Sequence, residues 1–486
     1  HAAQPELTGT ADILESSLIS GLMHLSNDPD IKHAQLVEYL SSRAGLLIPR
    51  GVGVYTFPHR TFQEYLTACY LTDHDYPERI AELACSDFNR WREVALLAGA
   101  KAARGTASAI WTLADALCYT PVKPGCAEAQ LWGAHLAGMA LAETADVLHP
   151  SPRNQGKIDL VKTGLVQVLS QERLPAVERA RAGATLAHLG DPRQEVLTFE
   201  QMPFCFVPAG PFWMGAGKEG HQIELPDYWI SSYPVTQAQF AEFVQAGGYK
   251  ERRFWLEAIL GKRWNQHGFT GNDRNQRLAA ESYGDPYDLP VVGVSWYEAM
   301  AFTRWLGEQL RRQAVLPSEA EWEKAARGGL QVPATPLLRS ARQGFEAPAQ
   351  PLQPNPVVQQ IYPWGDQLNL NLANYAETGI GATSAVGCFP GGASPYGCLD
   401  MSGNVWEWTR SLWGIDWQKS DYRYPYHCED GREDLAAPGN IARVLRGGSF
   451  INVSRRMRWT TRRRIGPLFF INDIGFRVCF PHAPQA

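Results

Sequence analysis

Apolar residues recur at helical spacing near the start of the chain, between about residues 10 and 43. Leu14, Leu18 and Leu22 follow one another at intervals of four, and later apolar residues continue the pattern. This spacing places the apolar side chains on one face of a helix. The sequence therefore predicts that the chain opens with helices.

Two short apolar runs follow between residues 46 and 57. They flank a turn that contains Gly51 and Gly53, which predicts a β-hairpin, and residues 59–66 open a further helix. The order helix, hairpin, helix is typical of a winged-helix domain. We therefore expect a winged-helix-like domain over residues 1–75.

The pattern is purely helical from about residue 79 to residue 196. Runs rich in Ala and Leu alternate with short loops that carry Pro, Gly and Asp. This arrangement resembles stacked helical pairs of the HEAT type, although no strict repeat period can be assigned. We expect residues 76–200 to form a helical arm.

The pattern changes again at Met202, where strands become short and turns frequent. Residues 205–207 and 212–214 flank a Pro/Gly turn and predict a hairpin. Long stretches rich in Pro, Gly and Asn, at residues 251–290 and 330–356, read as surface loops.

Three capping boxes predict where the helices of this last region begin. A Ser or Thr is followed three residues later by Glu or Gln at Thr236, Ser295 and Ser318. Helices among short strands predict a mixed domain over residues 201–486.

Composition indicates a globular protein of several domains. The chain has 486 residues, 45% of them hydrophobic and 20% charged, with a formal net charge of −5. No apolar run reaches the roughly 18 residues that would span a bilayer. The nine cysteines are an odd number without CxxC pairs, so we expect reduced thiols and a cytoplasmic location, with no membrane partner.

Positive charge is concentrated in the tail from Arg443 to Phe480. Nine arginines face a single acid, Asp473, and aromatic residues are interleaved with them without a helical or strand period. Arginine and aromatic residues in an irregular segment are typical of binding surfaces. Pairing of these arginines with buried acids, and filling of the core by the aromatics, is the alternative.

Two parts of the chain resemble known families. The string YTFPHRTFQEYLTACYL resembles the segment that ends the nucleotide-binding module of NACHT-type signalling ATPases. The sequence has no G-x-x-x-x-G-K-[ST] loop, so this chain cannot be read as the ATPase itself.

The second resemblance covers about residues 202–481. The motifs FVPAGPFWMG, YPVTQAQFAEF, LPVVGVSWYEAMAFTRWL, LPSEAEWEKAARGG, YPWGD, DMSGNVWEWTRS and RVLRGGSF…GFRVC follow in the order seen in the formylglycine-generating-enzyme, or sulfatase-modifying-factor, family. The resemblance implies an α+β fold of C-type-lectin type, preceded here by the all-α, winged-helix and HEAT-like region. Within it we expect four tryptophans to fill the core: Trp305, Trp322, Trp406 and Trp408.

Enzymes of that family oxidise a substrate cysteine with two cysteines placed shortly after the GGS motif. Only a thiol has the low pKa and the softness for that role. This chain has no cysteine between Glu429 and Val478, and Ser454 falls about where one is expected. We therefore expect no catalytic residues and no enzyme activity.

The same fold also serves as a variable ligand-binding domain in proteins diversified by retroelements, where Asn codons change at their adenines. The tail of this chain stands at the equivalent place. Every candidate except Trp459 is reachable from an Asn codon by changing adenines only. The candidate ligand-binding residues are Ile451, Asn452, Val453, Arg456, Trp459, Arg463, Arg464, Ile465, Leu468, Phe469, Phe470, Ile471, Asn472 and Asp473.

The resemblance also implies a structural calcium site in the stretch DMSGNVWE, with Asp400 and Glu407 as the side chains that supply oxygen. Pairing of Glu407 with a framework arginine is the alternative. No other cofactor is expected.

We interpret the chain as a ligand-recognition protein and as the sensor end of a larger signalling ATPase. Its partner would be a protein or other macromolecule bound at the tail. One alternative is a nucleic-acid binder, because six arginines lie between residues 455 and 464 with aromatics among them. The other is an inactive relative of the formylglycine-generating enzyme.

Overall fold

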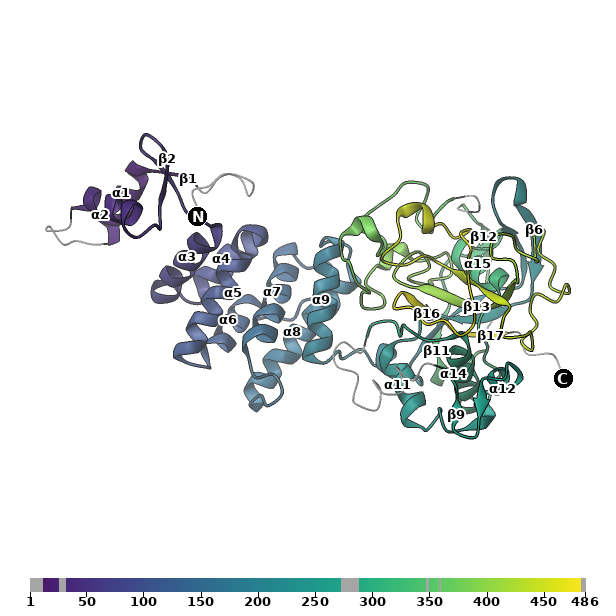
Figure 1. Ribbon diagram of the computed structural model, residues 1–486. Coiled ribbons are helices and arrows are strands. Elements are labelled where there is room, and N and C mark those ends of the chain that lie inside the picture. Colours follow the sequence, from purple (N-terminus) through teal and green to yellow (C-terminus); the bar gives the residue numbers. More distant parts are fainter. Residues whose placement is uncertain are drawn as a thin grey trace. The chain divides into compact units, whose positions relative to one another are not determined.

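The structure is a computed structural model that describes residues 12–25, 32–271, 288–346, 349–356, 358 and 360–481. The chain divides into two compact units, with the boundary between Leu165 and Val166. Each unit is built differently, as Figure 1 shows.

The first unit opens with the predicted helices and hairpin. A three-stranded antiparallel sheet of order β1-β3-β2 lies beside two helices. The elements are β1 (Asp12–Leu14), α1 (Glu15–Leu25), α2 (His33–Ser42), β2 (Ile48–Gly51) and β3 (Val54–Thr56). The predicted order of helix, hairpin and helix is confirmed.

Helices make up the rest of the first unit, as the apolar spacing predicts. They pack closely where small residues allow it. A Cβ atom on Gly133 would lie 2.3 Å from the carbonyl oxygen of Leu117, so only glycine fits at this crossing. The helices are α3 (Arg60–His74), α4 (Glu78–Ser86), α5 (Phe88–Gly105), α6 (Ala109–Leu117), α7 (Glu128–Thr144) and α8 (Pro152–Ser170), the last of which runs across the boundary.

Two four-stranded sheets form the centre of the second unit. The first has the order β11-β4-β7-β17 and is antiparallel throughout. Its strands are β4 (Pro203–Val207), β7 (Tyr228–Ser231), β11 (Leu338–Ser340) and β17 (Cys479–Pro481).

The second sheet has the order β15-β14-β13-β16, and its β13–β16 pair is parallel. Its strands are β13 (Trp406–Gly414), β14 (Ala442–Arg446), β15 (Arg463–Ile465) and β16 (Ile474–Phe476). Three two-stranded ribbons complete the strands: β5 (Gly210–Met214) with β6 (His221–Leu225), β8 (Trp264–Asn265) with β9 (Gly268–Phe269), and β10 (Gln331–Pro333) with β12 (Leu352–Pro354).

The hairpin predicted from residues 205–207 and 212–214 is wrong. β4 pairs with β7 and β11, whereas β5 pairs with β6. Both strands exist, but apolar alternation carries no information on partners that lie far apart in the sequence.

The helices of the second unit begin where the capping boxes predict. The side chains of Thr236, Ser295 and Ser318 each accept a hydrogen bond from the backbone N–H three residues on. The helices are α9 (Ala176–Leu189), α10 (Gln194–Leu197), α11 (Gln237–Gln245), α12 (Leu256–Leu260), α14 (Trp296–Gln309) and α15 (Glu319–Arg327). The short 3₁₀ turns are η1 (Gly217–Glu219), η2 (Arg252–Phe254), η3 (Ala341–Gln343), η4 (Ala376–Thr378), η5 (Pro390–Gly392) and η6 (Ser454–Arg456).

The two stretches predicted as surface loops are partly structured. Residues 251–271 hold α12 and a ribbon, and they bury Phe254 and Trp255. The remainder of the first stretch, residues 272–287, lies outside the described residues. The stretch 330–356 contributes β11 to the first sheet.

Aromatic side chains fill the core of the second unit. The four tryptophans predicted as core residues are all buried, and edge-to-face contacts such as Phe240 with Phe476 link α11 to the second sheet. The α+β class is therefore confirmed. The division into domains at residues 75 and 200 stays a prediction. Across the described residues, no helix is both long and apolar enough to cross a membrane.

Candidate ligand-binding surface

Most of the candidate residues lie on two segments beside the second sheet, residues 449–456 and 466–473, while Trp459 lies between these segments and Arg463, Arg464 and Ile465 form β15. Ser449 joins the two segments. Its hydroxyl oxygen lies 2.9 Å from Asn452 Oδ1 and 2.8 Å from Asp473 Oδ2, and its backbone N–H donates to Asn452 Oδ1 at 3.1 Å. The two segments therefore form one surface.

Hydrogen bonds to residues of another part of the domain hold the backbone of the first segment. The carbonyl of Asn452 accepts a hydrogen bond from the N–H of Ala376 (3.0 Å). The N–H of Ser454 donates to Glu377 Oε1 (3.0 Å), and its carbonyl accepts from the hydroxyl of Tyr362 (3.2 Å). Ser454, the residue at the expected cysteine position, thus lies in η6, and its backbone groups help to hold this segment in place.

A double glycine opens this segment and explains its course. Gly448 has φ +79°, and a Cβ atom there would lie 2.9 Å from the carbonyl oxygen of Arg456 and 2.9 Å from the sulfur of Met457. Only glycine combines this backbone conformation with so close an approach.

The second segment is anchored on α14 and on the loop before it. The carbonyl of Pro467 accepts from the N–H of Trp296 (3.0 Å), and that of Ile471 accepts from the N–H of Gly293 (3.1 Å). Leu468 and Ile471 are half-buried and pack against the main core.

Four large apolar side chains extend from these segments into solvent. Their exposed fractions are 57% for Ile451, 43% for Val453, 54% for Phe469 and 47% for Phe470. Three arginines and one asparagine in the same part of the chain are exposed as well. We call the exposed set the C-terminal surface: Ile451, Val453, Arg455, Arg456, Arg458, Phe469, Phe470 and Asn472.

Three candidate residues are buried, so their prediction as surface contacts is wrong. Trp459 is 1% exposed, its carbonyl accepts from the guanidinium of Arg446, and Arg327 lies 5.3 Å from the centre of its ring. Ile465 belongs to β15 and packs into the core. Asp473 is buried, and its backbone carbonyl accepts from Trp406 N–H at 2.8 Å.

Arg463 and Arg464 are half-buried rather than free at the surface. Arg463 lies 3.4 Å from Asp473 Oδ2 and 5.5 Å from the centre of the Trp406 ring. Arg464 lies 5.2 Å from the centre of the Trp413 ring. Asn452, turned toward Ser449, is also half-buried.

Several arginines of the tail pair with buried acids, which is the alternative that the sequence left open. Arg446 contacts Glu319 at 3.2 Å and also Glu323, and Arg462 donates to Glu319 at 2.9 Å. Burial raises the pKa of Glu319, but the guanidinium groups of Arg462 and Arg446 outweigh it and hold the pKa below its usual value.

Arg458 differs from these, because its side chain is exposed. Arg455 and Arg458 were both missed as surface residues. Their place in a run of arginines resembles that of the buried ones, and no period in the sequence separates the two groups.

The predicted calcium site does not fit its residues. Glu407 is fully buried; its Oε2 accepts from Trp322 Nε1 (2.7 Å) and Arg477 Nε (2.6 Å), and its Oε1 accepts from Arg477 Nη2 (2.7 Å). Both carboxylate oxygens of Glu407 accept hydrogen bonds from these groups, and a cation bound there would be repelled by the guanidinium of Arg477. Burial raises the pKa of Asp400 to about 6. The pairing alternative therefore describes Glu407, and within the described ranges no group of three or more His, Cys, Asp or Glu residues could hold a metal ion.

Fold and surface together define a mixed domain with an irregular tail displayed on a sheet. The family described as "Sulfatase-modifying factor enzyme 1-like domain" matches residues 192–480, and the "Winged helix-turn-helix domain C-terminal to NACHT" matches residues 7–71. The chain belongs to the sulfatase-modifying-factor, or formylglycine-generating-enzyme-like, family.

Relatives match over the same domain. "Serine/threonine-protein kinase pkn1" of Chlamydia caviae is 28% identical over 56% of this chain and 37% of its own length. "Hercynine oxygenase" of Mycolicibacterium thermoresistibile is 33% identical over 49% of this chain and 48% of its own length. "Formylglycine-generating enzyme" of Bos taurus is 25% identical over 57% and 74%. The chain thus spans little more than a third of the kinase-named relative.

Among solved structures, "Treponema denticola variable protein 1" is similar, with 20% identity, coverage of 57% of this chain and 95% of that chain, and a TM-score of 0.35.

The expectation that the chain has no enzyme activity is overturned by these relatives. Proteins named as enzymes match across the domain that carries the candidate surface. This sequence lacks the cysteine pair, but that absence argues only against reactions that need two cysteines at that place.

Proposed function

We propose that the chain recognises a protein ligand through the C-terminal surface. The observation that carries the proposal is the exposure of four large apolar side chains on segments whose backbones are hydrogen-bonded to the scaffold. Exposed apolar clusters ringed by polar residues are typical of interaction sites in soluble proteins.

The support beneath this surface favours tight binding. Backbone bonds from Ala376, Gly293 and Trp296 hold the segments, and Leu468 and Ile471 pack into the core. A ligand that docks on Phe469 and Phe470 would then order few residues, so little conformational entropy would be lost.

The composition of the surface indicates the chemistry of the partner. Phe469, Phe470 and Ile451 would enter an apolar depression, and Arg455, Arg456 and Arg458 would face acidic residues at its rim. Aromatic residues together with arginine are a common composition of interaction surfaces.

The nucleic-acid alternative is less well supported. Of the arginines between residues 455 and 464, Arg462 pairs with Glu319 and Arg463 with Asp473, so their charge is compensated. A nucleic-acid site needs uncompensated cations along a backbone path.

We also propose that the first unit connects this recognition domain to a signalling ATPase. Support comes from the match of residues 7–71 to the winged helix that follows NACHT modules. In this arrangement, ligand binding at one end would be transmitted through the helices to the ATPase.

Affinity capture from an extract of the source organism tests the recognition proposal. The full chain is compared with Phe469→Ala/Phe470→Ala and with a control, Leu256→Ala/Leu260→Ala, which removes two similarly exposed apolar side chains from α12. We expect a protein that the native chain and the control retain and that the first double variant loses.

Retention of the same proteins by all three chains would contradict the proposal. Retention of DNA or RNA that is lost with rising salt, rather than of a protein, would favour the nucleic-acid alternative.

A further inference from the structure

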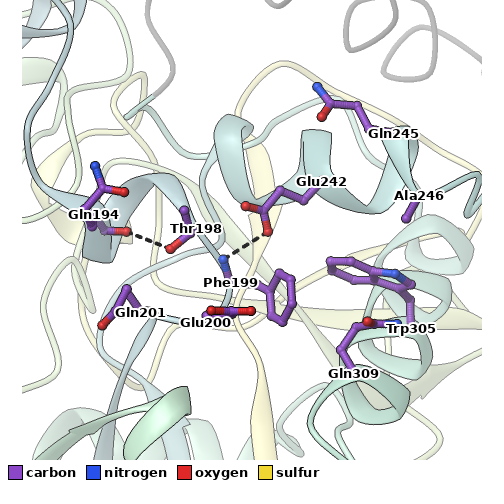
Figure 2. A pocket seen from close by; sticks show the side chains of 10 residues that line it. All are labelled: Gln194, Thr198, Phe199, Glu200, Gln201, Glu242, Gln245, Ala246, Trp305 and Gln309. Carbon is purple, nitrogen blue, oxygen red and sulfur yellow. Dashed lines mark hydrogen bonds between the residues drawn. The ribbon is translucent and has the colours of Figure 1, made fainter.

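A second candidate site lies on the same unit, formed by the end of α10, the segment that follows it, and the C-terminal ends of α11 and α14. It is an open groove with a volume of about 480 Å³. We call it the α11–α14 groove. Its lining residues are Gln194, Thr198, Phe199, Glu200, Gln201, Glu242, Gln245, Ala246, Trp305 and Gln309, shown in Figure 2.

Two carboxylates line this groove without a basic partner. Glu242 Oε2 accepts a hydrogen bond from the backbone N–H of Phe199 at 3.2 Å. Burial raises the pKa of Glu242, and the negative charge of Glu200 raises it further. None of the lining residues is basic, and over the described part of the chain neither carboxylate takes part in an ion pair. The negative charge is therefore uncompensated.

Two aromatic rings form the apolar part of the wall. The rings of Phe199 and Trp305 meet edge to face, with centres 5.0 Å apart and planes at 72°. Figure 2 shows Glu242 and Trp305 next to Phe199, from two different helices.

Trp305 also carries an unsatisfied donor. Its side chain is 3% exposed, and its Nε1–H has no acceptor among the described residues. A buried N–H without a partner is costly, which is why most such groups in native proteins are satisfied by protein, water or ligand.

We propose that the α11–α14 groove binds the guanidinium group of an arginine residue within a peptide. The two carboxylates supply the countercharge that guanidinium requires, and the planar group is weakly hydrated and stacks on aromatic rings. The amide oxygens of Gln201, Gln245 and Gln309 are further acceptors for its five N–H donors.

The unsatisfied indole of Trp305 is the reason to expect a peptide rather than a free cation. Nε1 is enclosed in this structure, so the ring would have to turn toward the groove for a peptide carbonyl next to the arginine side chain to accept from its N–H, whereas an alkylguanidine without a carbonyl offers no acceptor. The volume suits a residue-sized group, since ligand sites commonly measure about 300–1,000 Å³.

This site is independent of the C-terminal surface, so either proposal can fail alone. The test is calorimetric titration of the full chain with N-acetylarginine methylamide, its neutral citrulline analogue, its lysine analogue and agmatine. The arginine compound should bind at least tenfold more tightly than the citrulline compound, and more tightly than the lysine compound and agmatine.

Glu242→Gln and Glu200→Gln should each weaken arginine binding about tenfold. Glu429→Gln, which removes an exposed glutamate outside the groove, should leave it unchanged. If Glu242→Gln disturbs folding, the test rests on Glu200→Gln alone, because Glu200 is exposed.

Equal binding of the arginine and citrulline compounds, no binding of either, or an equal loss with Glu429→Gln would overturn the proposal. Agmatine binding as tightly as the arginine compound would assign the groove to a free guanidine instead of a peptide.

Discussion

Removing Arg477 should destabilise the second unit more than removing any exposed arginine. Arg477 is fully buried, pairs with Glu407 through two nitrogens, and also donates to the carbonyls of Ser231 (2.9 Å) and Leu399 (3.0 Å). Arg477→Met would leave the carboxylate of Glu407 buried with one remaining donor, the indole of Trp322.

The expected loss follows from burial of a charge without its partner. Breaking a fully buried ion pair from one side costs about 3–5 kcal/mol of unfolding free energy. Since whole domains are stable by only about 5–15 kcal/mol, this is a fifth or more of the total.

The double variant Arg477→Met/Glu407→Leu separates the pair from its surroundings. Both charges are gone, and the remaining cost comes from the indole of Trp322 and the carbonyls of Ser231 and Leu399, which lose their side-chain partners, at about 1–3 kcal/mol for a buried group left unsatisfied. We therefore expect the double variant to lose clearly less than the sum of the two single variants, with a coupling of about 3 kcal/mol.

Urea unfolding followed by tryptophan fluorescence measures these losses. Thirteen of the 16 tryptophans lie between residues 213 and 459, so the signal reports mainly the second unit. Arg458→Met is the control, because that arginine is exposed. Additive losses in the double variant, or a loss for Arg477→Met no larger than for Arg458→Met, would refute the reasoning.

Three further predictions rest on burial and charge. Phe469→Ala/Phe470→Ala should lower the unfolding free energy by about 1 kcal/mol or less per residue and the melting temperature by a few degrees. Trp459→Ala should lower the unfolding free energy by about 3–5 kcal/mol. Equal losses in thermal unfolding would place the two phenylalanines in the core. Burial raises the pKa of Asp400 to about 6, so ionisation of this carboxyl opposes folding as the pH rises from about 4 to 6. Asp400→Asn should therefore stabilise the protein by up to about 3 kcal/mol at pH 8 and should not stabilise it at pH 4. A gain in stability that is the same at both pH values would count against this. Calcium added after chelation should leave the melting temperature unchanged, because both oxygens of Glu407 are occupied; a rise of several degrees would show a site that these contacts do not explain.

The sequence was most informative where a short pattern is determined by interactions between residues close together in the chain. The capping boxes at Thr236, Ser295 and Ser318 placed three helices, because a cap involves only residues three positions apart. The failed hairpin between β4 and β5 shows the limit, since β4 pairs with β7 and β11, more than 20 residues away.

In the tail, exposure could be predicted only for part of the residues. Leu468, Phe469, Phe470 and Ile471 stand together in the sequence, yet the outer two pack into the core and the inner two are exposed. Irregular backbone has no period from which the buried side could be read. Trp459 is instructive, because it alone is unreachable from an Asn codon by adenine changes, and it is buried.

Site-specific photocrosslinking in cells of the source organism tests the recognition proposal most directly. A benzoylphenylalanine replaces Phe469 in one chain and Leu260, an exposed residue on α12, in another. We predict a crosslinked protein adduct from position 469 that is absent from position 260 and is lost when Phe470→Ala is added. No adduct at position 469, or the same adducts from both positions, would contradict a ligand-binding role for the C-terminal surface.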